Sequence, residues 1–133
     1  MARPDQVFHL REKEKELGFA QAVRSGDTLY VAGTCSVGLD NQVVAPGDMR
    51  GQIEHIYGII AMALEAHGAS FVNIVKEMIF VSGIEALREA LPLRARFYQD
   101  AAPPAATWIQ MAGFMRPEFV VEIEVTAELP ADK

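Results

Sequence analysis

Residues 119–127 constrain the fold more than any other segment, because their polarity alternates strictly with a period of two. One face would carry Phe119, Val121, Ile123 and Val125, and the other Val120, Glu122, Glu124 and Thr126. This alternation is typical of a β-strand with one buried face. Because Val120 shares the second face, we expect Glu122 to lie in partly apolar surroundings, where a carboxylate is costly unless it has a partner or a function.

The remaining strands are predicted from short runs of β-branched and aromatic residues that end at turn residues. Two of them form a hairpin around Ser25-Gly26-Asp27, since Gly and Asp supply the backbone freedom that a tight turn needs. The predicted strands lie at 20–24, 28–33, 74–81 and 107–112, with a short one near Val43 and Val44 in the loop 34–47.

Two helices are predicted between these strands. The first begins at Asp48, a favoured N-cap residue, carries one apolar stripe along its length and ends at Gly68. The second covers 84–98 and is expected to break at Pro92, which lacks the amide that a helix interior needs. The mixed charges of 11–16 predict a solvated surface turn or edge.

This order of elements predicts an α+β fold, formed by a single domain over residues 1–133. Two helices cannot cover both faces of a sheet of about four to six strands, so we expect both helices on one face. The other face is expected to carry Tyr30, Trp108 and Val120, which a solvated face would not need. A homo-oligomer that covers this second face is therefore expected.

Composition excludes several classes of function. The net charge is -6 and no basic block occurs, so nucleic acid is not an expected partner. No apolar run approaches the ~20 residues of a membrane span, and the charged N-terminus lacks a signal-peptide core, so we expect a cytoplasmic protein with no membrane contact. The single cysteine, Cys35, excludes an internal disulfide, and the spacing of the histidines does not indicate a metal site. No metal or cofactor is expected.

Four motifs resemble segments of one known family. They are Gly18–Val23, Ser25–Gly33, His67-Gly68 before a buried strand, and Val121–Ala127. On these motifs the chain resembles the Rid family, also called YjgF, YER057c or UK114. The resemblance implies a chorismate-mutase-like α+β fold and a homotrimer, in which the sheets form a central barrel and clefts lie between subunits. It also implies a small-molecule substrate, since family members hydrolyse reactive enamines and imines to ketones and ammonia.

The family's site residues transfer only in part. The carboxylate of its last strand corresponds to Glu122, which we expect to hold and activate water, and its glycine after the second strand corresponds to Gly33. The arginine that grips the substrate carboxylate should stand fifteen residues before Glu122, where this chain has Thr107. A threonine hydroxyl cannot replace a bidentate, charge-assisted hydrogen bond, so activity on simple imino acids does not follow from the resemblance.

Other polar positions of the family pattern are also replaced. Phe19 and Ala20 stand at its tyrosine and serine, Ala32 at a second serine, and Leu91 at an asparagine. Phe19 and Trp108 could line an apolar cleft or pack at an interface. The predicted substrate-binding residues around the catalytic Glu122 are Phe19, Ala32, Gly33, Thr34, Cys35, Thr107 and Trp108.

Three functions remain open. The first, which we predict, is an enamine or imine deaminase whose substrate is not one of the simplest imino acids; otherwise another arginine must bind the substrate carboxylate, with Arg24, Arg96 and Arg116 as candidates. The second is a trimeric protein that binds a small apolar or aromatic metabolite without catalysis. The third is RNA cleavage, a label sometimes attached to the family, against which the acidic charge balance argues.

Overall fold

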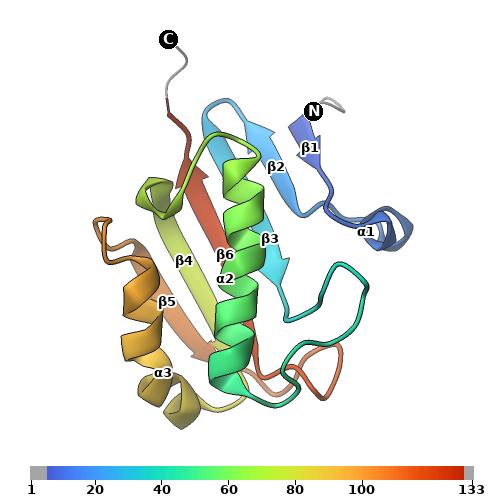
Figure 1. The fold of residues 1–133 in the computed structure, drawn as a ribbon, viewed down its shortest axis with the longest axis vertical. Coiled ribbons are helices and arrows are strands. Elements are labelled where there is room, and N and C mark those ends of the chain that lie inside the picture. Colours follow the sequence, from blue (N-terminus) through green and yellow to red (C-terminus); the bar gives the residue numbers. More distant parts are fainter. Residues whose placement is uncertain (1–5, 131–133) are drawn as a thin grey trace.

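Six strands form one mixed sheet in the computed structural model, which describes residues 6–130 (Figure 1). The strands are β1 (Val7–Phe8), β2 (Ala22–Ser25), β3 (Thr28–Thr34), β4 (Ile74–Val81), β5 (Ala105–Gln110) and β6 (Val121–Glu128). The helices are α1 (Glu12–Leu17), α2 (Met49–Glu65) and α3 (Ile84–Phe97), with a short 3-10 helix at Phe71–Asn73. The strand order is β1-β2-β3-β6-β4-β5; β4 and β5 run parallel, and the other neighbours are antiparallel.

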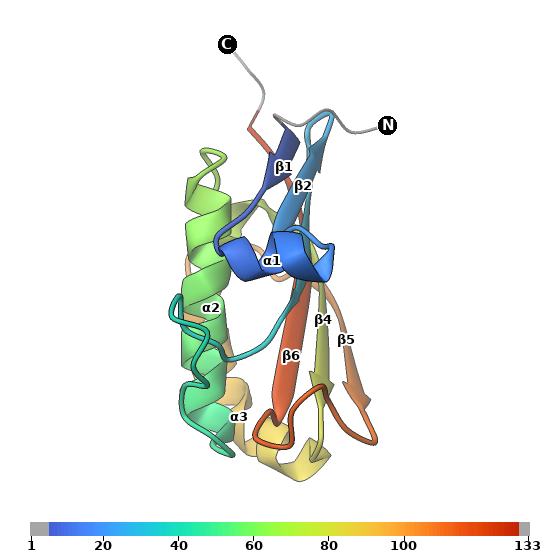
Figure 2. The same cartoon turned by 90° about the vertical axis from the view of Figure 1, so that its right-hand side faces the viewer.

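The α+β prediction is confirmed, and the two long helices, α2 and α3, cover the same face of the sheet (Figure 2). β2 to β6 lie within two residues of the bounds predicted for them. The alternation of the last strand turns Val121, Ile123 and Val125 towards the helices, where each is at most 3% exposed. These side chains meet the apolar stripe of α2, so one hydrophobic core fills the space between the sheet and the helices. None of the described helices is long and apolar enough to cross a membrane.

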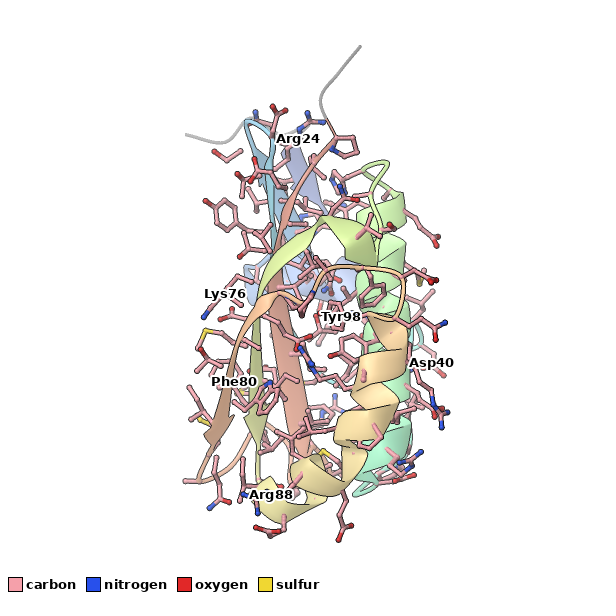
Figure 3. The ribbon with its side chains drawn as sticks, turned by 90° about the vertical axis from the view of Figure 1, so that its left-hand side faces the viewer. Arg24, Asp40, Lys76, Phe80, Arg88 and Tyr98 are labelled. Carbon is pink, nitrogen blue, oxygen red and sulfur yellow. The ribbon has the colours of Figure 1, made fainter. Side chains whose placement is uncertain are left out.

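The second face of the sheet is uncovered within one subunit. Figure 3 shows Lys76 pointing away from the helices, whereas Tyr98 lies between the helices and the sheet. Tyr30 on β3 is 53% exposed. The expectation that Trp108 belongs to this open face is wrong. The register of β4 and β5 pairs Trp108 with the buried Ile79, and the guanidinium carbon of Arg94 in α3 lies 5.4 Å from the centre of its ring, so Trp108 faces the helices.

Residues 11–16 were expected to form a turn, but most of them belong to helix α1. Gly18 ends this helix in the left-handed conformation, with φ at 83°, and its amide donates to the Glu14 carbonyl at 2.9 Å. The Glu14 side chain is 1% exposed and accepts the backbone amides of Leu10 and Arg11. The charge pattern alone did not distinguish this buried carboxylate from its exposed neighbours, and the short strand β1 was also not predicted.

Helix α3 continues through Pro92, so the predicted break is wrong. The fixed φ of proline is compatible with a helix, and its main cost is a missing hydrogen bond and a steric clash with the preceding turn. Leu87, Ala90 and Leu93 are buried in the core and hold both halves of the helix against the sheet. Asp48 is the N-cap residue of α2 as predicted, although its side chain makes no capping hydrogen bond.

Candidate active site

A cleft of about 660 Å³ lies beside the end of β3 and contains Glu122. Its walls come from α1, from the segment that follows β3 and from the loop between β5 and β6. The apolar lining consists of Leu17, Phe19, Val37, Met115 and Phe119. The other lining residues are Arg11, Lys13, Glu14, Gln21, Gly33, Thr34, Cys35, Asn41, Arg116 and Glu122. The cleft therefore combines one large apolar surface with charged groups of both signs.

Glu122 lies against the end of β3 because β3 pairs with β6. The register of this pair shifts between Val31 and Thr34, and the irregular segment contains Gly33. A Cβ atom at Gly33 would lie 3.0 Å from the carboxyl carbon of Glu122, closer than side chains normally approach. The absence of a side chain at Gly33 thus leaves the space that the carboxylate occupies.

The Glu122 carboxylate has one hydrogen-bond partner among residues 6–130. The Cys35 thiol donates to Oε1 of Glu122 at 3.3 Å. Burial and, after it, the negative charge of Glu122 raise the pKa of the Cys35 thiol well above its usual range. The thiol therefore stays protonated at neutral pH, which suits a donor that orients a carboxylate and not a nucleophile. Oε2 of Glu122 is left to accept a proton or a hydrogen bond from water or a ligand.

The α1 wall of the cleft is tied to the segment after β3 by Arg11. Its guanidinium donates to the carbonyls of Val37 at 2.6 Å and Gly38 at 3.1 Å. Glu14 lies 3.5 Å from the same guanidinium and also accepts the amide of Gln21 at 3.1 Å. These contacts join segments distant in sequence, so the sequence offered no signal for Arg11 or Glu14 as parts of the site.

The loop between β5 and β6 is fixed by Gln52, a fully buried residue of α2. Its side-chain amide donates to the carbonyls of Ala45 at 2.9 Å and Glu118 at 2.8 Å, and its oxygen accepts the amide of Val120 at 3.0 Å. Buried amides of this kind are costly to leave unpaired, so the contacts restrain the loop. The third wall of the cleft is thereby attached to the long helix.

Five of the predicted site residues meet in this cleft: Phe19, Gly33, Thr34, Cys35 and Glu122. Thr34 is buried, and its hydroxyl accepts from Gln21 at 2.9 Å and donates to the Ala32 carbonyl at 2.8 Å, so it supports the wall. The other three, Ala32, Thr107 and Trp108, do not line the cleft of the same subunit. The Thr107 hydroxyl accepts a hydrogen bond from Lys76 at 3.0 Å.

The three arginines proposed as replacements for the missing cation lie in different places. Arg116 lines the cleft that contains Glu122. Arg24 is at the β2–β3 turn, where it donates to the Gly26 carbonyl at 2.9 Å, and Arg96 lines a separate depression beside α3. Spacing in the sequence did not separate these candidates, because the β5–β6 loop folds back onto the end of β3. Within residues 6–130, no three His, Cys, Asp or Glu side chains gather in a group that could hold a metal ion.

Comparison with known proteins gives consistent matches. A sequence profile described as endoribonuclease L-PSP matches residues 12–129. A RutC family protein from Sulfurisphaera tokodaii is 22% identical over 107 residues, which cover 80% of this chain and 84% of that protein. The crystal structure of Rv2704 from Mycobacterium tuberculosis, a member of the YjgF/YER057c/UK114 family, has a TM-score of 0.79 and 27% identity over 93% of this chain and 98% of that chain. The Rid protein YyfA from Yersinia pestis, described as of unknown function, has a TM-score of 0.80 and 24% identity over 84% of this chain and 88% of that chain.

Proposed function

The chain belongs to the endoribonuclease L-PSP family, which includes the YjgF and Rid proteins, and from this premise we propose that it hydrolyses a reactive enamine or imine to a carbonyl compound and ammonia. The observation that supports this function most directly is the half-buried Glu122 carboxylate, which accepts a hydrogen bond from Cys35 in a cleft with a large apolar lining. A carboxylate positioned in this way can take a proton from water as the water attacks.

The proposed chemistry uses Glu122 twice. Water bound at Oε2 transfers a proton to the carboxylate while its oxygen bonds to the imine carbon, and the proton then passes to the imine nitrogen. The resulting carbinolamine gives its hydroxyl proton to Glu122, and Glu122 passes this proton to the nitrogen as the C–N bond breaks, so that the nitrogen leaves as ammonia. One water is consumed, one ammonia is released, and the carboxylate is regenerated. Cys35 holds Oε1, so that Oε2 keeps one orientation throughout.

Small imines derived from serine or threonine should be poor substrates, because Thr107 stands where the family pattern has a carboxylate-binding arginine and because these imines are too small to contact the apolar lining of the cleft. Loss of a charge-assisted bidentate bond weakens binding by roughly 10- to 100-fold. The assay generates the enamine in situ with a serine or threonine dehydratase and follows ammonia release, in parallel with a family member that has the arginine. An imine made from phenylalanine by an amino-acid oxidase serves as the larger substrate.

Equal rates on the small imines would show that another residue binds the substrate carboxylate, and that the replacement of the family arginine by Thr107 matters less than expected. Absence of hydrolysis of the small and the large imine alike would overturn the proposed activity itself. The alternative of a family member that binds a metabolite without catalysis would then be favoured.

RNA cleavage is less consistent with the site, although the family description names a ribonuclease. The net charge of -6 disfavours binding to a phosphate backbone. Within the described part of the chain, no histidine lines the cleft, so the common general acid for expelling a ribose oxygen is missing there. The acidic charge and the apolar lining fit a small organic molecule better.

We expect a homotrimer, with a mass of about three times the 14.6 kDa of the subunit. The reason is the uncovered face of the sheet, on which Tyr30 is 53% exposed while both long helices lie on the opposite face. Light scattering at micromolar concentration measures this directly. A stable monomer would remove the barrel and any contribution of a neighbouring subunit to the cleft.

A further inference from the structure

Of the cations that line the cleft, Arg116 is the one without a carboxylate partner in the described part of the chain. Arg11 is bonded to Glu14 and to two backbone carbonyls. Lys13 forms an ion pair with Glu16 at 3.2 Å. Within residues 6–130, no carboxylate lies within ion-pair distance of Arg116, and its guanidinium lies over the ring of Phe119. Arg116 is therefore the cation that a ligand in the cleft can pair with.

The backbone around Arg116 is held in place before any ligand binds. The Phe119 amide donates to the Arg116 carbonyl at 3.2 Å, and the guanidinium carbon lies 5.9 Å from the centre of the Phe119 ring. Glu118 is two residues after Arg116, and the side chain of Gln52 in helix α2 bonds to the backbone of Glu118 and of Val120. A restrained arginine loses less conformational entropy when it binds an anion than one on a mobile loop.

The residues that line the cleft indicate which kind of anionic ligand would bind to Arg116. Glu122 repels a negatively charged ligand, so an anionic substrate in the same cleft needs a cation to offset that charge. Leu17, Phe19 and Met115 provide apolar surface, and a volume of about 660 Å³ is far larger than a three-carbon imine requires. A substrate that contacts both the arginine and these side chains has a carboxylate and a bulky apolar group.

We propose that Arg116 binds the carboxylate of the substrate, and that the substrate is the imine or enamine of an amino acid with a bulky apolar side chain. This inference rests on the proposed hydrolysis at Glu122 and specifies its substrate class. The imine must be supplied by a reaction that oxidises such an amino acid or eliminates a group from it. Hydrolysis of the imine then gives the corresponding α-keto acid.

The test measures binding of phenylpyruvate, the keto-acid product of the phenylalanine imine, by calorimetry. Arg116→Gln should weaken this binding by roughly 10- to 100-fold, and Arg116→Lys should retain part of it, because lysine keeps the charge without the planar fork. The matched control is Arg96→Gln, which removes an arginine that lines a different depression and should leave the affinity unchanged. The methyl ester of phenylpyruvate should bind the wild type more weakly and be insensitive to Arg116→Gln, and pyruvate should bind more weakly than phenylpyruvate.

The possible outcomes distinguish the role of Arg116 in binding from the proposed catalysis by Glu122. Equal affinity of the wild type and Arg116→Gln, equal affinity for pyruvate and phenylpyruvate, or no binding by the wild type at millimolar concentration would each overturn the inference. Because a product is bound, the measurement does not require turnover. If phenylpyruvate binding depends on Arg116 but the protein hydrolyses no imine, the role of Arg116 is supported and the proposed function is rejected. If the protein hydrolyses the imine and Arg116→Gln changes neither binding nor rate, the proposed function is supported and the role of Arg116 is rejected.

Discussion

Glu122→Gln should lower the rate of imine hydrolysis by roughly 10²- to 10⁴-fold, the contribution of a positioned acid–base group. Glutamine keeps the shape of the side chain and can still accept the Cys35 thiol at its oxygen, but it cannot take a proton from water. The melting temperature should change little, because no cation is paired with Glu122 among the described residues. Initial rates of ammonia release with the phenylalanine imine, together with thermal melting, measure both effects.

Glu124→Gln is the matched control for this variant. Glu124 lies two residues further along the same strand and on the same face, but it borders a depression with Tyr30 and Lys76 instead of the cleft. Its substitution should leave hydrolysis within about twofold of the wild type, a change below 0.5 kcal/mol. An unchanged rate for Glu122→Gln would reject Glu122 as the catalytic base, and a large loss of stability would indicate a structural role for its charge.

The fold could be predicted because its determinants are local. The period-two alternation of 119–127, the Ser25-Gly26-Asp27 turn and the single apolar stripe after Asp48 each depend on residues close together in the sequence. The errors occurred where tertiary contacts override local preference. α3 passes Pro92 because one side of the helix is buried, and residues 12–17 form a helix because the carboxylate of Glu14 is bonded to backbone amides in the interior.

The site was predicted in part for the same reason. Glu122 and Gly33 lie on two paired strands and Cys35 directly follows the first of them, so motif spacing located the three together. Arg116 could be named only as one of three candidates, since its position depends on how the β5–β6 loop folds back towards β3. Contacts made by long loops depend on many weak tertiary interactions and leave no periodic signal in the sequence. The structure therefore adds most to the prediction where loops form the site.

A buried polar cluster on the other side of the sheet was also missed, and it leads to the largest expected change in stability. Oε1 of Glu77 accepts Nε of Arg94 at 2.7 Å, and Oε2 accepts the hydroxyls of Tyr57 and Tyr98 at 2.6 Å each. Burial, followed by the charge of Glu77, raises the pKa of both tyrosines, so both hydroxyls stay protonated and donate. Burial lowers the pKa of Arg94, but the neighbouring Glu77 carboxylate outweighs it and raises that pKa overall.

Glu77→Leu should therefore destabilise the protein by about 3–5 kcal/mol, because it leaves the Arg94 charge and two hydroxyls without their acceptor in the core. Urea unfolding at one fixed protein concentration measures the change, since an oligomer's apparent stability depends on concentration. Adding Arg94→Met to Glu77→Leu should recover part of the loss, because the stranded charge is then removed as well.

The control for this cluster is Glu85→Gln, which breaks an exposed ion pair with Arg88 at the start of α3, the helix that also carries Arg94. Its cost should not exceed about 1 kcal/mol, because water screens that pair. A similarly small cost for Glu77→Leu would mean that packing, and not the charge pair, stabilises this region. The register of β4 and β6 pairs Glu77 with Val125, a core residue, and Glu122 projects from the opposite face of β6. Glu77→Leu protein that remains folded at low temperature should thus hydrolyse the phenylalanine imine at nearly the wild-type rate, which separates the residue that stabilises the fold from the one proposed to act on substrate.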